Sequence, residues 1–204
     1  MILAFKLFLY LIIIFSAVFH EYCHGAMAYY LGDPTAKYAG RLTLNPLRHI
    51  DLMGTVIIPL TLLFFLGGFI GWAKPVPYNP YNLRDQRYGS AKVGLAGPAA
   101  NFALALIFGL ILRFLPITGF LYIAFSWIVY VNIFLALFNL IPIPPLDGSK
   151  LLMDFFPQSR TMYLLNQSFI GIFLAIALAI MFLPYISSFI YFIITAHPFL
   201  GLVF

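Results

Sequence analysis

Five consecutive residues, His20-Glu21-Tyr22-Cys23-His24, place two imidazoles and a carboxylate inside an apolar stretch. On a helix, His20 and His24 differ by about 40° in azimuth, so both imidazoles can bind one metal ion from the same face. Glu21 lies about 60° beyond His24, where its carboxylate can accept a proton from metal-bound water rather than bind the metal. Two imidazoles and a carboxylate suit zinc, which also favours an open coordination position. The spacing therefore predicts a zinc site that activates water.

Two histidines need a third ligand, and Asp147 is the acidic residue best placed to supply it. It alone among the aspartates follows a long apolar stretch, within Pro144-Pro145-Leu146-Asp147-Gly148, where prolines break the helix and free the carboxylate to point inward. The alternative is that Asp147 only caps a helix at the membrane interface. A thiolate from Cys23 is chemically possible, but on the helix Cys23 lies about 100° from His24, away from Glu21. We expect it to be a small buried residue.

The composition indicates which elements must position these residues. Of 204 residues, 63% are hydrophobic and 8% are charged, whereas soluble domains carry about 25% charged residues. The mean hydropathy is +1.01. These values exclude a soluble protein and indicate membrane helices rather than barrel strands. The net charge of +5 is more typical of cytosol-facing loops than of nucleic-acid binding, and a single cysteine excludes an internal disulfide.

The apolar stretches predict an all-α polytopic membrane protein with about five spanning helices. These helices are expected over residues 2–31, 93–114, 120–141, 164–183 and 185–204, with Pro184 as a hinge between the last two. Residues 41–45 alternate polar and apolar side chains, which predicts a short interfacial strand or hairpin. We interpret 1–204 as a single membrane domain, with a core over about 3–155 and a C-terminal helical pair over about 164–204.

Residues 52–72 are apolar but are interrupted by Pro59 and three glycines. His20, His24 and Asp147 must meet on one side of the membrane, and a full crossing by this segment would separate them. We therefore expect the segment to be re-entrant, which a membrane protein tolerates where the backbone lines a wet cavity. One face then carries most of the basic residues, which points this site toward the cytosol. They are Lys37, Arg41, Arg48, Lys74, Arg84, Arg87, Lys92, Lys150 and Arg160, leaving Lys6 and Arg113 opposite. We expect a multi-pass protein of a prokaryotic cell membrane.

Three segments together resemble the site-2 protease family of intramembrane zinc metalloproteases. They are HEYCH at 20–24, GPAAN at 97–101 and NLIPIPPLDG at 139–148, and the likeness covers about residues 15–155. The stretches GRLTLNP at 40–46 and GWAKPVP at 71–77 resemble the compact subgroup, which has no PDZ or CBS domain. The resemblance implies that His20, His24 and Asp147 bind one zinc ion per chain and that Glu21 is the catalytic base. It also matches Asn139 to an asparagine near the family's active site.

The resemblance implies hydrolysis of membrane-spanning substrates within the bilayer, as in regulated intramembrane proteolysis. Asn139 and Asn101 are candidates to hydrogen-bond the substrate or the developing oxyanion, the alternative being interhelical hydrogen bonds. The predicted strand Arg41-Leu42-Thr43-Leu44-Asn45 either takes up an unwound substrate by strand addition or only seals the site. His49 is expected at the surface of its polar loop. The rival function is a catalytically silent zinc-binding membrane scaffold or transporter subunit.

Overall fold

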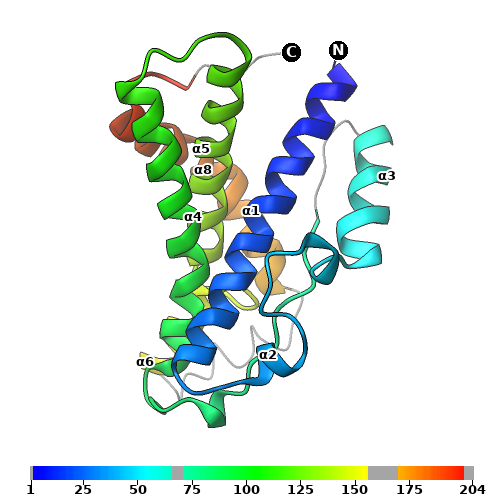
Figure 1. Cartoon of the computed structure of the whole chain (residues 1–204), viewed down its shortest axis with the longest axis vertical. Coiled ribbons are helices and arrows are strands. Elements are labelled where there is room, and N and C mark those ends of the chain that lie inside the picture. The colour runs from blue at the N-terminus through cyan, green and yellow to red at the C-terminus, as the bar shows by residue number, and fades with distance from the viewer. Residues whose placement is uncertain (1, 66–70, 156–169, 200–204) are drawn as a thin grey trace.

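The computed structural model describes residues 2–65, 71–155 and 170–199. Four helices in these ranges are long and apolar enough to cross a membrane, and they run side by side through the molecule (Figure 1). They are α1 (Ile2–Tyr30), α4 (Gly89–Phe114), α5 (Gly119–Leu140) and α8 (Ile170–Thr195). The described part of the chain contains no strand. The chain is therefore an all-α polytopic membrane protein, as the composition predicts.

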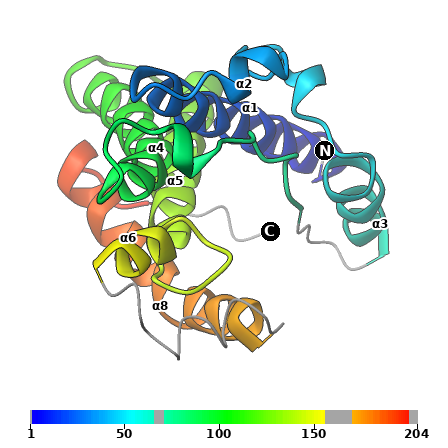
Figure 2. The ribbon, with the colours of Figure 1, turned by 90° about the horizontal axis from the view of Figure 1, so that it is seen from below.

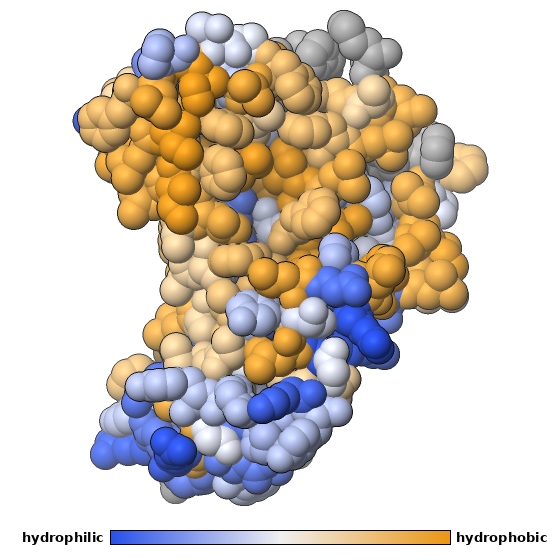
Figure 3. Space-filling view, in the orientation of Figure 1, coloured by the Kyte–Doolittle hydropathy of each residue, from blue (hydrophilic) through white to orange (hydrophobic). Residues whose placement is uncertain are grey.

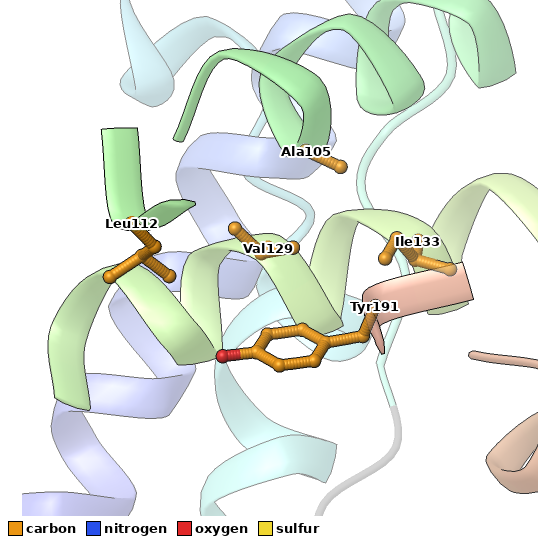
Figure 4. Packing of buried hydrophobic residues seen from close by; sticks show 5 residues of the cluster. All are labelled: Ala105, Leu112, Val129, Ile133 and Tyr191. Atoms are coloured by element: carbon orange, nitrogen blue, oxygen red, sulfur yellow. The ribbon is translucent and has the colours of Figure 1, made fainter. Parts of the chain in front are cut away.

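Small and branched residues let α4, α5 and α8 pack closely. Ala105 and Leu112 of α4, Val129 and Ile133 of α5, and Tyr191 of α8 form one buried cluster (Figure 4). The Tyr191 hydroxyl donates a hydrogen bond to Ser126 Oγ at 3.0 Å, so its one polar atom is satisfied within the bundle. Close approach through small residues and buried hydrogen bonds is how helices associate where lipid removes the hydrophobic driving force.

The shorter elements lie in the connections between the long helices. They are α2 (Thr35–Tyr38), η1 (Pro46–Arg48), the π-helical turn η2 (Leu52–Ile57), α3 (Ile58–Phe65), η3 (Pro80–Asn82) and α6 (Gly148–Phe155). α2 and α6 lie at the lower end of the molecule in Figure 1, beneath the long helices, and Figure 2 shows this end from below. On the face shown in Figure 3, hydrophilic side chains gather at this end and in a second patch at mid-height on the right, whereas apolar side chains cover most of the upper part.

The two ends of the segment 52–72 lie together, as a re-entrant segment requires. The Trp72 N–H donates to Gly54 O at 3.0 Å, and Thr55 Oγ1 donates to Trp72 O at 2.9 Å. The next link is the Lys74 N–H, which donates to His49 O at 2.9 Å. η2 and α3 follow one another without a break over Leu52–Phe65, and their six and eight residues make about 21 Å of helix, still short of a bilayer core of about 30 Å. Residues 66–70 of this segment lie outside the described residues.

The predicted pair of C-terminal helices is wrong for the part of the chain that the structure describes. α8 continues through Pro184 from Ile170 to Thr195 as one helix, so four long helices are present where about five were expected. Proline is tolerated in membrane helices, although the missing Pro184 N–H frees the carbonyl of Ile180 one turn earlier. One turn later, Ser188 Oγ donates to Pro184 O at 2.8 Å. The predicted positions 164–169 and 200–204 are outside the described residues.

The predicted strand over Arg41–Asn45 is also wrong, because these residues form bends that lead into η1. Their hydrogen bonds are local. The Thr43 N–H donates to Arg41 O at 2.9 Å, and Asn45 Oδ1 accepts from the Leu47 N–H at 3.0 Å. Asn and Thr side chains compete with strand ladders by bonding to nearby backbone. Five alternating residues without a neighbouring strand do not overcome that competition.

Candidate metal centre

Three side chains from distant parts of the chain converge on one point. Asp147 Oδ2 lies 3.0 Å from His20 Nε2 and 3.0 Å from His24 Nε2, and the two Nε2 atoms are 2.9 Å apart. All three residues are buried. Among the described residues they are the one group of three histidine, cysteine or acidic side chains whose ligand atoms are close enough to share a metal ion.

The local chain explains this convergence. His20 and His24 are one helical turn apart on α1, which continues without interruption to Tyr30. α5 ends at Leu140, and the proline-rich turn that follows brings Asp147 to the start of α6. The Lys150 ammonium, one turn into α6, donates to Asp147 Oδ1 at 2.8 Å. Because Lys150 engages one carboxylate oxygen, the other is directed at the histidines.

The hydrogen bond made by Nδ1 of each histidine determines whether its Nε2 carries a proton or a lone pair. His20 Nδ1 lies 2.6 Å from Asn101 Oδ1, and His24 Nδ1 lies 2.6 Å from Val93 O. Since both oxygens only accept hydrogen bonds, both Nδ1 atoms carry the proton and both Nε2 atoms present a lone pair. An ionised Asp147 also only accepts. Three converging lone pairs without a proton between them repel one another, so this donor set fits a bound cation.

Helix α4 passes directly over the two imidazoles at Gly97. A Cβ atom at this position would overlap the Nε2 atoms of both His20 and His24. Gly97 belongs to the segment Gly97-Pro98-Ala99-Ala100-Asn101, which therefore has a structural role at the site. Only glycine allows α4 to lie this close to the histidine pair.

A cavity of about 500 Å³ opens beside the three side chains, between α1, α5, α8 and the segment 46–73. Its polar lining includes Glu21, His20, Thr55 and Asn139, whereas most of its wall is apolar. Glu21 Oε2 accepts a hydrogen bond from the Val76 N–H at 2.8 Å, which ties the carboxylate to the segment 71–79. The structure thus brings Glu21 to the cavity next to the predicted ligands, outside the ligand cluster itself.

The two candidate asparagines occupy different places. Asn139 lines the cavity, and its amide donates to Leu135 O at 3.0 Å. Asn101 is fully buried on the other side of His20 and does not line the cavity. Its Nδ2 donates to Asn132 Oδ1 at 2.8 Å. This placement favours a role for Asn101 toward His20 rather than toward a substrate.

The structure also shows residues that the sequence did not single out. His49, expected at the surface, is 1% exposed, and its Nε2 donates to Thr43 O at 2.8 Å while the residue lines the cavity. Arg41–Asn45, in contrast, contribute no residue to the lining of this cavity. Asn132 of α5 was missed as well, although an asparagine in the middle of a spanning helix is itself a signal, because an amide in lipid requires partners.

Asp33 holds the segment that carries Val76 against α1. This buried carboxylate accepts hydrogen bonds from the Asn79 N–H at 2.6 Å, Asn82 Nδ2 at 2.9 Å and the Thr35 N–H at 3.1 Å. Burial by itself raises the pKa of Asp33, but the hydrogen bonds from Thr35, Asn82 and Asn79 outweigh it and hold that pKa below its usual range. The position of Val76 near Glu21 thus depends on an ionised aspartate at the end of α1.

Comparison with known proteins agrees with this geometry. The chain is 38% identical over 159 residues to YwhC of Bacillus subtilis (strain 168), named as a candidate zinc metalloprotease, and the match covers 74% of this chain and 69% of YwhC. It is 36% identical over 135 residues to Rip2 of Mycolicibacterium smegmatis, which is named likewise, with 65% and 51% covered. MJ0611 of Methanocaldococcus jannaschii, a third protein so named, is 30% identical over 135 residues, with 66% and 63% covered.

The chain thus spans about half the length of Rip2. No solved structure matches it. The sequence profile of peptidase family M50 matches residues 8–122 and 117–184, which together are most of the chain. The chain therefore belongs to peptidase family M50, the site-2 protease family of metalloproteases.

Proposed function

We propose that this protein is an intramembrane zinc metalloprotease that hydrolyses peptide bonds of membrane-spanning substrates. The observation that carries the proposal is the convergence of His20, His24 and Asp147 beside Glu21, on a cavity enclosed by apolar helices. These three side chains hold one zinc ion per chain. Bound zinc lowers the pKa of a coordinated water molecule toward about 7.

Glu21 acts as the general base. Its carboxylate lines the cavity next to the ligand cluster, and the hydrogen bond from the Val76 N–H orients it. Glu21 takes a proton from the attacking water and delivers it to the nitrogen of the leaving amine. A site that only stored or carried metal would have no use for an ionisable carboxylate at this depth, where an unpaired charge is costly.

The substrate enters as an extended segment. A cavity of about 500 Å³ cannot hold an α-helix, whose diameter with side chains is about 10–12 Å, so a membrane-spanning substrate must unwind before cleavage. Unwinding exposes backbone groups that need partners in an apolar setting. Asn139 lines the cavity and provides an amide that can hydrogen-bond such a backbone.

The end of the molecule that contains the site faces the cytosol of a prokaryotic cell. In the part of the chain that the structure describes, Lys6 lies near the start of α1 and Arg113 in the last turn of α4. The other basic residues lie in the connection from the end of α1 to the first turn of α4, or in α6 just after α5. These other residues are Lys37, Arg41, Arg48, Lys74, Arg84, Arg87, Lys92 and Lys150. An excess of lysine and arginine marks the cytosolic face.

The test is cleavage of a panel of single-span fusion proteins by the purified, reconstituted enzyme. We expect cleavage that a chelator abolishes and added zinc restores. The variant Glu21→Gln should still bind one zinc ion per chain but should lose activity by about 10²–10⁴-fold, because the base is lost while the ligands remain. Undiminished cleavage by this variant would show that Glu21 is not the base. Stoichiometric zinc with no cleavage of any fusion would favour the silent scaffold.

A further inference from the structure

A buried polar network connects the candidate metal centre to the middle of α5. We propose that Asn132 is a positioning residue, which orients the Asn101 amide so that His20 presents an unprotonated Nε2 to the metal. This inference rests on the proposed zinc site. It concerns a residue on α5 that contributes no atom to the site itself.

The network joins three helices. Asn101 of α4 lies between His20 of α1 and Asn132 of α5. Asn101 Oδ1 is 2.6 Å from His20 Nδ1, and Asn101 Nδ2 donates to Asn132 Oδ1 at 2.8 Å. Asn101 Nδ2 is also 3.4 Å from Ser16 O on α1. Asn132 Nδ2 donates to Ile128 O at 2.8 Å and to Ser16 Oγ at 3.0 Å. Asn101 and Asn132 have no exposed surface.

Which atoms donate and which accept in this network is determined by a backbone carbonyl, which can only accept. The oxygen and nitrogen of an asparagine amide are nearly equal in size, so sterics alone allow either one to face His20. Ile128 O is a backbone carbonyl and accepts only, so Asn132 turns its nitrogen toward it and its oxygen toward Asn101. Asn101 must then donate to Asn132 and present its oxygen to His20 Nδ1. The proton of His20 consequently lies on Nδ1.

The opposite arrangement would disable the ligand. If Asn101 presented its nitrogen, His20 Nδ1 would have to accept, and the ring proton would move to Nε2, which faces Asp147 and His24. A protonated Nε2 cannot bind a metal ion. Because Asn101 has no exposed surface, replacing Asn132 by an apolar residue leaves only the long 3.4 Å contact with Ser16 O to distinguish the two ends of the Asn101 amide.

The alternative is that Asn132 only holds the helices together. Interhelical amide bonds do stabilise membrane bundles, and in that case its loss lowers the unfolding temperature without a specific effect on zinc. The two roles differ in how Asn132 and Asn101 combine. If Asn132 is a positioning residue, it affects zinc binding only by choosing which end of the Asn101 side chain faces His20. Its effect on zinc affinity must therefore disappear when the two ends of side chain 101 are equivalent.

Asn101→Asp provides that condition, because both carboxylate oxygens accept and either can face His20 Nδ1. We would measure zinc affinity by chelator competition in purified full-length protein for Asn132→Leu, Asn101→Asp and the double variant. We expect Asn132→Leu to weaken zinc binding by about 10–100-fold, as the loss of outer-shell partners typically does. In the Asn101→Asp background, the same change should leave zinc affinity within about twofold.

Two outcomes would overturn the inference. One is zinc affinity unchanged in folded Asn132→Leu, and the other is an equal loss in both backgrounds, which indicates a structural role. If Asn132→Leu does not fold, as judged by thermal unfolding, Asn132→Ala in the same two backgrounds makes the same distinction. Because zinc affinity is read without a substrate, wild-type protein that fails to bind zinc contradicts the proposed function, whereas normal zinc binding in Asn132→Leu contradicts this inference alone.

Discussion

At the scale of single residues, the absence of a side chain at Gly97 shapes the centre as much as the ligands do. A methyl group there would overlap both imidazoles, so Gly97→Ala must displace α4 or the histidines. We expect zinc affinity to fall at least about tenfold, with an overpacking cost of about 1–3 kcal/mol in unfolding free energy. Zinc content after dialysis against a weak chelator, together with thermal unfolding, would measure both effects.

Gly109→Ala is the matched control, since it places the same methyl group on the same helix but against Ile194 of α8. It should lower the unfolding temperature and leave zinc binding intact. Loss of zinc in both variants would mean that the effect reflects general destabilisation of α4. Full zinc binding by Gly97→Ala would show that the histidine pair tolerates a closer helix than the structure indicates.

The sequence predicts which residues share one face of a helix, but it predicts less well which residues from distant segments lie close together in the fold. His20 and His24 could be paired because one helical turn separates them, and Asp147 because prolines precede it after a long apolar stretch. His49 was misassigned because its polar neighbours resemble a surface loop, although the returning segment at Trp72 and Lys74 covers it. The role of Asn132 depends on how α5 packs against α4, which no local pattern contains.

At the scale of elements, the segment 71–82 depends on Asp33 for its position beside Glu21. Asp33→Asn removes the charge and one acceptor from a set of partly buried hydrogen bonds. We expect a loss of about 1–2 kcal/mol at neutral pH, or about 2–8 °C in unfolding temperature. Activity should fall as well, because Val76 no longer orients Glu21 as firmly.

The pH dependence of this effect has a defined sign. The pKa of Asp33 in the folded protein lies below the ordinary value of 3.8, so its ionised form stabilises the fold above that value. This contribution is lost as the pH falls toward the folded pKa. Thermal unfolding of wild type and Asp33→Asn at pH 7, 5 and 3 should therefore show a gap that narrows at pH 3. A constant gap over this range contradicts the assignment.

Elements with long, uniform patterns were predicted best. The helices expected over 2–31, 93–114 and 120–141 correspond to α1, α4 and α5 within a few residues. The errors occurred where a local signal competes with the membrane environment. A proline usually breaks a helix in water, but α8 continues through Pro184. The alternating stretch Arg41–Asn45 is too short to form a strand, because its Thr43 and Asn45 side chains bond to nearby backbone N–H groups instead.

At the scale of the whole molecule, the distribution of basic residues supports the proposal that the site faces the cytosol. Asn45 and Arg84 are both exposed and flank the re-entrant segment and its return. We expect a cysteine at position 45 and one at position 84, each in a Cys23→Ser background, to react with an impermeant thiol reagent from the cytosolic side. Cysteine accessibility in intact cells and in inverted vesicles would measure this. Labelling of the two positions from opposite sides would mean that the segment 52–72 crosses the membrane.

The central claim is that His20, His24 and Asp147 bind one zinc ion, and X-ray absorption at the zinc edge tests it most directly. The wild-type protein should show two imidazoles and oxygen ligands at about 2.0–2.2 Å, and Asp147→Ala should bind zinc at least about tenfold more weakly. Asp154→Ala is the control, because Asp154 accepts from the Ala91 N–H in the neighbouring helix and does not belong to the cluster. A sulfur ligand at about 2.3 Å, or full zinc affinity in Asp147→Ala, would contradict the account.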